Sequence, residues 1–376
     1  MKRFLAYAGL LAAACVGCAT PPERLAPEPE GPVVGPGAQL VVWEVENDES
    51  LDLWYHALAL MGAPNPGEEE AFPLPSYRVG YAAMIEQAKR ARDVYPTPLD
   101  TAVARIRARI EEAGGAAATQ NLSFIPLYLP PPWSVTAALT TWSRAEGDPA
   151  KAGSAAASAV VNRLNTLIPE AEVRAATMEL AGLLETEAQL FYREYRVSNL
   201  QEIRATVAAV RETWRALREQ LRTFLDYLQL EGGDLMLSPA LGVEGRSLIT
   251  NVTRPVVATQ LPPDGDAEAA VWAFLHELMY ALVPEVIERH AAPSEIEDVG
   301  VQTLTTRAAV RAGEMLLEER SPVRLEAYRS FFVRAADPAI SAPESRTAAA
   351  LARTFPLSDR LASGLRETIA LANAGI

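Results

Sequence analysis

The residues best suited to chemistry are a histidine and a glutamate that adjoin each other in an apolar stretch, residues 271–288. His276 is one of only three histidines in the chain, and Glu277 follows it directly. Positions 276 and 280 share one face of a helix, because they are one turn apart. Two imidazoles at that spacing, with a glutamate after the first, hold a zinc ion and supply a base for its bound water. Here Tyr280 occupies the position of the second imidazole.

The segment 235–335 resembles the zincin-like metallopeptidases. It carries the first half of their H-E-x-x-H pattern as His-Glu-Leu-Met-Tyr at 276–280. A β-rich stretch precedes the motif, and residues 256–261 are the candidate edge strand. Asp266 is the expected N-cap of the motif helix, and Pro284 is its expected end. A carboxylate-bearing helix follows. The resemblance implies a zincin-like helical domain with a short antiparallel sheet.

The resemblance also implies roles for individual residues. His276 would be a zinc ligand, Glu277 the general base, and Glu297 the carboxylate ligand from the following helix. Glu295 and Glu314 are alternatives to Glu297. A neutral phenol is a poor substitute for the missing imidazole, because its pKa is near 10.

Three hypotheses therefore stand side by side. In the first, the domain has the zincin-like fold, holds no metal and acts in binding or scaffolding of a protein or peptide partner. In the second, it is an active zinc metallopeptidase with an altered ligand set and Glu277 as its base. In the third, it is an unrelated helical lipoprotein in which the His-Glu pair is a coincidence. Whether the protein is an enzyme is left open.

Other functional classes lack sequence support. The chain contains no Gly-x-Ser-x-Gly elbow, phosphate-binding loop, dinucleotide fingerprint or C-x-x-C pair. Its net charge of −14 argues against nucleic acid as a partner. His56 lies in an apolar run, and we expect it to be a buried structural histidine rather than a ligand.

The amino-terminal residues 1–17 have the pattern of a secretory signal peptide, with a short basic start and an apolar run too short to span a bilayer. The end of this run resembles a bacterial lipobox, which implies cleavage before Cys18 and attachment of lipid, including palmitate, to that cysteine. Cys15 is the alternative. The body contains no other cysteine. We expect a protein anchored by lipid in the cell envelope, at the outer membrane facing the periplasm or the cell surface.

The remaining chain divides into a tether and a body. Residues 18–37 hold six prolines, so they form a stiff, extended tether rather than a packed element. Residues 38–376 form the body, with helical spacing of apolar residues through most of its length and clearest over 200–230. Strand-like residues occur at 39–46 and within 235–261. The expected fold class is mainly α with a small β element.

Overall fold

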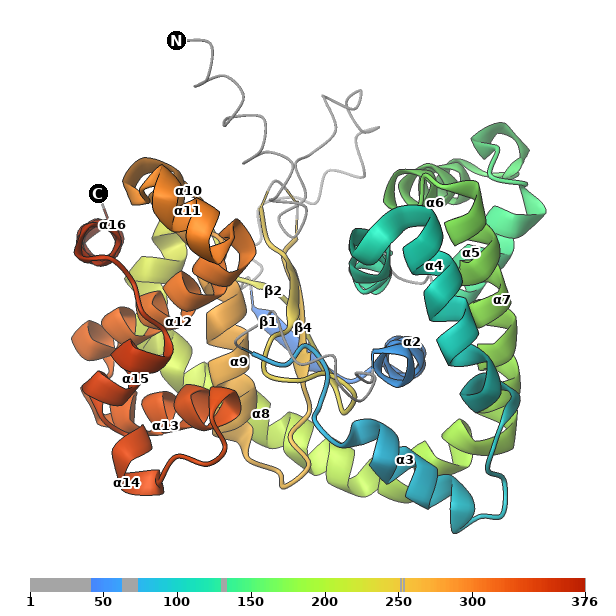
Figure 1. Cartoon of the computed structure of the whole chain (residues 1–376), viewed down its shortest axis with the longest axis horizontal. Coiled ribbons are helices and arrows are strands. Elements are labelled where there is room, and N and C mark those ends of the chain that lie inside the picture. The colour runs from blue at the N-terminus through green and yellow to red at the C-terminus, as the bar shows by residue number, and fades with distance from the viewer. Residues whose placement is uncertain (1–41, 63–73, 130–133, 251, 253, 376) are drawn as a thin grey trace, which may run out of the picture.

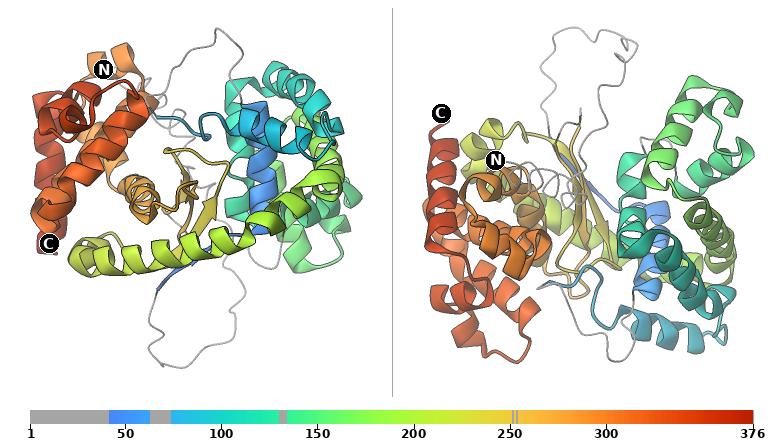
Figure 2. Two further views of the ribbon diagram at one scale, coloured as in Figure 1. Left: turned by 90° about the horizontal axis from the view of Figure 1, so that it is seen from below. Right: turned by 45° about the horizontal axis from the view of Figure 1, so that its top comes forward.

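The computed structural model describes residues 42–62, 74–129, 134–250, 252 and 254–375. It confirms a mainly helical chain with one small sheet. Two helical lobes lie on either side of this sheet, and one long helix runs along both of them (Figures 1 and 2). The sheet is therefore the central layer of the molecule.

The sheet has four strands in the order β1-β2-β4-β3. These are β1 (Trp43–Glu46), β2 (Gly233–Ser238), β3 (Arg246–Leu248) and β4 (Val256–Gln260). Strands β1, β2 and β4 are parallel to one another. Strand β3 lies at the edge and pairs antiparallel with β4. We expected an antiparallel sheet, whereas the observed sheet is mixed.

The expectation that residues 256–261 form the edge strand is wrong. Strand β4 lies between β2 and β3, and β3 is the edge. Pro255 suggested an edge position because proline has no N–H to donate to a neighbour. It lies just outside the strand, however, and its carbonyl accepts a hydrogen bond from the Asp234 N–H at 2.9 Å.

The amino-terminal lobe packs against one face of the sheet, with Leu241 and Ala258 in its core. Its helices and its π-helical turn are α2 (Glu49–Met61), α3 (Tyr81–Arg90), α4 (Pro98–Leu122), α5 (Val135–Arg144), α6 (Ala155–Leu167), α7 (Ala171–Glu187) and the turn Ala188–Tyr192. The predicted strand over 39–46 and the burial of His56 are both confirmed in the residues that the structure describes.

The carboxy-terminal lobe packs against the opposite face, with Leu235 and Val257 in its core. Its helices are α9 (Ala267–Met279), α10 (Val283–His290), α11 (Pro293–Val299), α12 (Val301–Arg320), α13 (Leu325–Ala336), α14 (Ala342–Ser345), α15 (Ala348–Thr354) and α16 (Asp359–Ala374). The long helix α8 (Arg193–Tyr227) leads from the π-helical turn into this lobe and buries Trp214 and Phe224 in the same core (Figure 2).

Helix α9 is the central helix of the carboxy-terminal lobe. Its predicted N-cap is confirmed, because the Asp266 side chain accepts hydrogen bonds from the N–H groups of Glu268 and Ala269. Every residue from 269 to 279 is buried. We expected Pro284 to end this helix, but α9 ends earlier, at Met279. Pro284 lies in the first turn of α10, where the missing N–H costs nothing and the fixed φ angle suits the helix.

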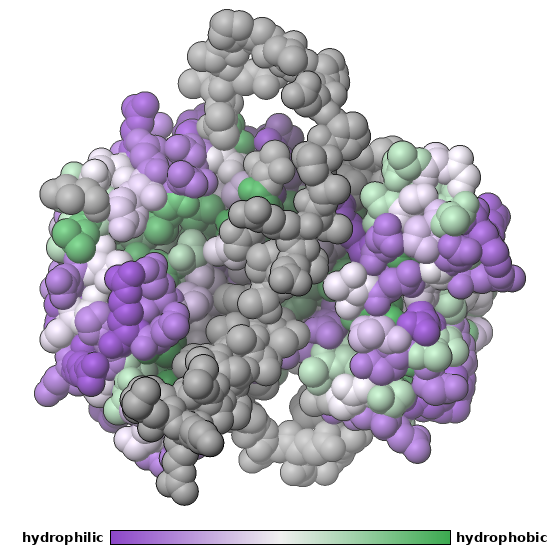
Figure 3. Space-filling model, turned by 90° about the horizontal axis from the view of Figure 1, so that it is seen from above, coloured by the Kyte–Doolittle hydropathy of each residue, from purple (hydrophilic) through white to green (hydrophobic). Residues whose placement is uncertain are grey.

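Among the described residues, no single helix is both long enough and apolar enough to cross a membrane. Helices α9 and α10 pass that test only as a pair, and they are bent by 49° at the break between them. Hydrophilic side chains are spread over both lobes in the face shown in Figure 3, with hydrophobic areas between them.

Candidate functional site

The His-Glu pair lies on α9 beside the edge strand. His276 is wholly buried and Glu277 is 2 % exposed. The Glu277 carboxylate accepts a hydrogen bond from the N–H of Gly245, directly before β3, at 2.9 Å. The same oxygen lies 3.3 Å from Nδ1 of His276. Glu277 therefore ties the motif helix to the edge strand.

Gly245 is required for this close approach. A Cβ atom at that position would lie 2.5 Å from the carbonyl oxygen of Ala258 and 3.0 Å from Cγ of Glu277. Real Cβ atoms are not found so close to a backbone oxygen, so any larger residue would displace either the strand or the helix. The Glu277 carboxylate is thus packed under the backbone.

Tyr280 turns its hydroxyl toward two residues from other elements. The hydroxyl lies 3.4 Å from Glu244 and 3.3 Å from Thr306 of α12. The hydroxyl of Thr306 is in turn 3.4 Å from the same oxygen of Glu244. These distances are long for hydrogen bonds between oxygen atoms, which have a usual separation of about 2.7 Å. The hydrogen bonds among Tyr280, Thr306 and Glu244 are therefore weak.

We call these five residues the His276 cluster: Glu244, His276, Glu277, Tyr280 and Thr306. Two of its polar atoms, Nε2 of His276 and Oε2 of Glu244, are buried and have no hydrogen-bond partner in the described part of the chain. Burial raises the pKa of Glu244. An unpaired buried polar atom costs about 1–3 kcal/mol, so this cluster is poorly satisfied for a purely structural core.

The cluster does not fit a zinc ion well. Structural and catalytic zinc sites take three or four His, Cys, Asp or Glu ligands at bond distance. The described residues contain no group of three or more such side chains that could hold a metal ion. Tyr280 and Thr306 contribute only neutral hydroxyl groups.

The carboxylates that the sequence singled out are exposed or engaged elsewhere. Glu297 is exposed on α11. Glu295 accepts hydrogen bonds from the N–H and hydroxyl of Ser358, at the start of α16. Glu314 forms ion pairs with Arg311 and Arg329, at 3.0 and 2.7 Å. Sequence reasoning missed Glu244, whose signal was a lone carboxylate between the apolar Val243 and Gly245 in a β-rich stretch.

A second buried histidine lies in the amino-terminal lobe. We call its group the His56 cluster: His56, Tyr81, Lys89, Thr97, Asp100 and Glu187. Nε2 of His56 lies 3.1 Å from Glu187, and Nδ1 lies 3.1 Å from the Tyr81 hydroxyl. Burial lowers the pKa of His56, so the ring is neutral at pH 7. Because a carboxylate only accepts, Nε2 carries the proton and Nδ1 accepts from Tyr81.

Glu187 is the centre of the His56 cluster. The Lys89 ammonium lies 2.7 Å from Glu187 and 2.7 Å from Asp100. The Thr97 hydroxyl donates to the other oxygen of Glu187 at 2.6 Å. Burial opposes ionisation of Glu187, but the hydrogen bond from His56 and the Lys89 ammonium outweigh it and lower the pKa to about 2. Both carboxylate oxygens are therefore paired.

Asp52 lies one turn before His56 on α2 and is also wholly buried. Its carboxylate accepts a hydrogen bond from the Asn47 amide at 2.6 Å and lies 3.7 Å from Nε of Arg196. Burial dominates these contacts and raises the pKa of Asp52 to about 7.

Cys18 and its alternative Cys15 lie outside the described residues, as does the tether. Comparison with known proteins places the chain in no group: no family model, curated protein or solved structure matches it.

Proposed function

We propose that the body is a zincin-like domain that holds no zinc and acts in binding or scaffolding. The observation that carries this proposal is the bond between Glu277 and the Gly245 N–H at 2.9 Å. It supports the resemblance, because it sets a His-Glu helix against an antiparallel edge strand. It also supports loss of catalysis, since a carboxylate tied to the backbone is poorly placed to activate water.

The residues around Tyr280 support the same proposal. A carboxylate from the helix after the motif would complete a glutamate-type zincin site. In this chain the contact from α12 comes from Thr306, a neutral hydroxyl. Of the expected ligands only His276 remains in the cluster, and one imidazole does not hold zinc against water.

One observation favours the alternative, an active zinc metallopeptidase. Glu244 brings a buried carboxylate to within 3.4 Å of the Tyr280 hydroxyl, and one oxygen of this carboxylate has no hydrogen-bond partner among the described residues. In that alternative Glu244, rather than Glu297, would supply the carboxylate ligand. The two proposals make opposite predictions about Glu277.

Hydrolysis of a quenched fluorescent peptide library, with and without added zinc, distinguishes them. The wild-type chain and Glu277→Gln should give the same background rate. Gln keeps an oxygen that accepts from Gly245, so the variant should fold normally. Cleavage by the wild type that Glu277→Gln abolishes would reject the proposal and establish the peptidase.

We further propose that lipid on Cys18 anchors this domain in the cell envelope. The support is the lipobox-like sequence and the absence of any cysteine from the body. Cys18→Ala should leave the precursor uncleaved by the lipoprotein pathway and without a labelled acyl chain, whereas Cys15→Ala should mature normally. Normal lipid labelling of the Cys18 variant would contradict the assignment.

A further inference from the structure

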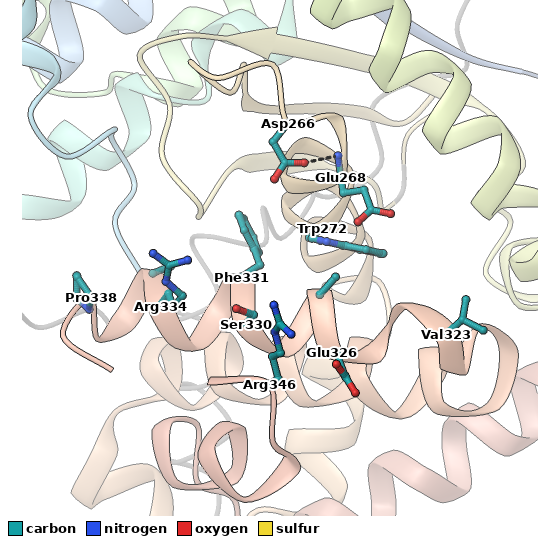
Figure 4. Close-up of a pocket in the computed structure, with 12 residues that line it drawn as sticks. Asp266, Glu268, Trp272, Val323, Glu326, Ser330, Phe331, Arg334, Pro338 and Arg346 are labelled. Carbon is teal, nitrogen blue, oxygen red and sulfur yellow. Dashed lines mark hydrogen bonds between the residues drawn. The ribbon is translucent and has the colours of Figure 1, made fainter. Parts of the chain in front are cut away.

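A hollow separate from both histidine clusters opens between α9 and α13. Its volume is about 620 Å³, which is within the usual range of ligand pockets. One wall is the first turns of α9, and the other is a face of α13 (Figure 4). The residues of α9 that line the hollow lie one turn or more before His276, so the hollow and the His276 cluster are separate sites.

The middle of the hollow is aromatic and apolar. Phe331 and Trp272 lie there from opposite walls in Figure 4. Ala327, Phe331 and Ala335 follow one another at four-residue spacing on α13, which gives that wall a continuous apolar stripe. Val323 lies at one end and is 91 % exposed, the highest value among the large hydrophobic side chains of the described chain.

The charges of the hollow are separated along its length. Arg334 lies toward the Pro338 end and Arg346 beside Ser330, whereas Glu268 and Glu326 lie toward the end at Val323 (Figure 4). Asp266 is a third carboxylate of the lining, and its side chain accepts hydrogen bonds from the N–H groups of Glu268 and Ala269 at the start of α9. Glu268 pairs with Arg324 at 2.6 Å. Within the described residues, Arg334, Arg346 and Glu326 make no hydrogen bond or ion pair with another side chain. Both guanidinium groups are exposed, so they are available to an anionic group of a ligand.

We propose that this hollow binds a short linear peptide with a free carboxyl terminus. The terminal carboxylate binds between Arg334 and Arg346, and an apolar side chain near the terminus packs against Phe331, with the buried Trp272 behind it. A basic group at the amino end lies near Glu326. The acidic end of the hollow is the reason for choosing a peptide, since a purely anionic ligand such as a fatty acid would be repelled there. The proposal does not depend on the absence of zinc.

Affinity selection tests this assignment. The full chain is incubated with a pool of tetrapeptides that begin with lysine, vary at the middle positions and end in phenylalanine with a free carboxylate. Bound peptides are separated by gel filtration and identified by mass spectrometry. A second pool has the same sequences with a carboxy-terminal amide. We expect retention from the first pool only.

Variants locate the binding. Arg334→Gln with Arg346→Gln should weaken binding of a retained peptide by about tenfold or more, because two charge-assisted hydrogen bonds are lost. Phe331→Ala should weaken it without restoring binding of the amide pool. Arg204→Gln, an exposed arginine on α8, is the matched control and should bind as the wild type does.

Three results would overturn the proposal. One is retention of no peptide from the carboxylate pool, and another is equal retention of both pools. The third is unchanged affinity of the double arginine variant, whose fold is checked by circular dichroism. None of these results bears on zinc binding or on hydrolysis, so this proposal can fail while the zinc-free domain stands, and the reverse.

Discussion

The two buried histidines of this protein differ in how well their surroundings satisfy them. In the His56 cluster both ring nitrogens have partners at 3.1 Å, and the carboxylate of Glu187 is paired at both oxygens. In the His276 cluster, Nε2 of His276 and one oxygen of Glu244 have none in the described part of the chain. Both histidines are wholly buried, so burial alone does not separate them.

This difference in hydrogen bonding bears on the role of each cluster. A network whose members are all paired stiffens a core and needs no ligand. Unpaired buried groups reduce stability, and each of them calls for an explanation such as a ligand, an ordered water molecule or a catalytic role. Other unpaired buried atoms of the described chain, such as Oδ1 of Asp52, lie outside the two clusters. The contrast supports a structural role for the His56 cluster, and it is in keeping with our proposal that the His276 cluster derives from an active site.

The largest expected effect is at Glu187. Glu187→Ala leaves His56 without its acceptor and leaves Lys89, a buried ammonium, with Asp100 as its one carboxylate partner among the described residues. Breaking a buried ion pair of this kind costs about 3–5 kcal/mol. Urea denaturation of the variant measures the loss.

Glu179→Gln is the matched control for that variant. Glu179 lies on α7 like Glu187 and pairs with Arg105 and Arg109, but its side chain is 32 % exposed. Its loss should change the unfolding free energy by less than about 1 kcal/mol. Equal losses at Glu179 and Glu187 would refute the structural role of the His56 cluster.

Asp52 is expected to make the amino-terminal lobe sensitive to pH. Its pKa is about 7 in the folded chain, against an ordinary value of 3.8, so between those values the folded state binds more protons than the unfolded state. The contribution of Asp52 to stability is therefore fully present below about pH 4 and is lost as the pH rises toward 7. The shift corresponds to at most about 4 kcal/mol.

Asp52→Asn should remove that part of the slope. Unfolding free energies are measured from pH 4.5 to 8 for the wild type and the variant. Their difference isolates Asp52 from other groups, such as Glu244, whose pKa is also raised. Parallel curves for the two proteins would show that Asp52 does not titrate in this range.

Gly245→Ala should destabilise the carboxy-terminal lobe by about 1–3 kcal/mol, because the added methyl group overlaps the Ala258 carbonyl. Thermal and urea denaturation measure this. Gly182→Ala, on α7 with open space around its Cβ position, should be neutral or slightly stabilising. If both variants behaved alike, the close contact between α9 and β3 would be in doubt.

Much of the fold could be predicted from sequence because it depends on local patterns. Asp266 was recognisable as an N-cap, and the spacing of apolar residues over 200–230 predicted most of α8. The position of a strand within a sheet is not a local property. Alternation and composition are the same in internal and edge strands, so β4 was taken for the edge that β3 occupies.

The candidate site divides in the same way. His276, Glu277 and Tyr280 could be identified because they lie on one helix at meaningful spacing. Glu244 and Thr306 reach the cluster only through the fold, 36 and 26 residues away from Tyr280 in sequence. The partners of Glu187 were equally hidden, since Thr97 lies 90 residues before it in the sequence and Lys89 lies still earlier.

The smallest expected effect is at His276 itself. His276→Leu removes an unpaired buried nitrogen and keeps an apolar side chain of similar size, so stability should change by less than about 1 kcal/mol. His56→Leu, in contrast, should cost more than this, because it deprives Glu187 and Tyr81 of their partner. Urea denaturation of the two variants compares the two clusters directly.

The most direct test of the central assignment is the zinc content of the mature chain. Wild type and His276→Ala are dialysed to equilibrium against micromolar zinc, and bound metal is measured by elemental mass spectrometry. We predict the same low, substoichiometric zinc in both proteins. Near-stoichiometric zinc in the wild type that His276→Ala removes would contradict the account and identify the His276 cluster as a working metal site.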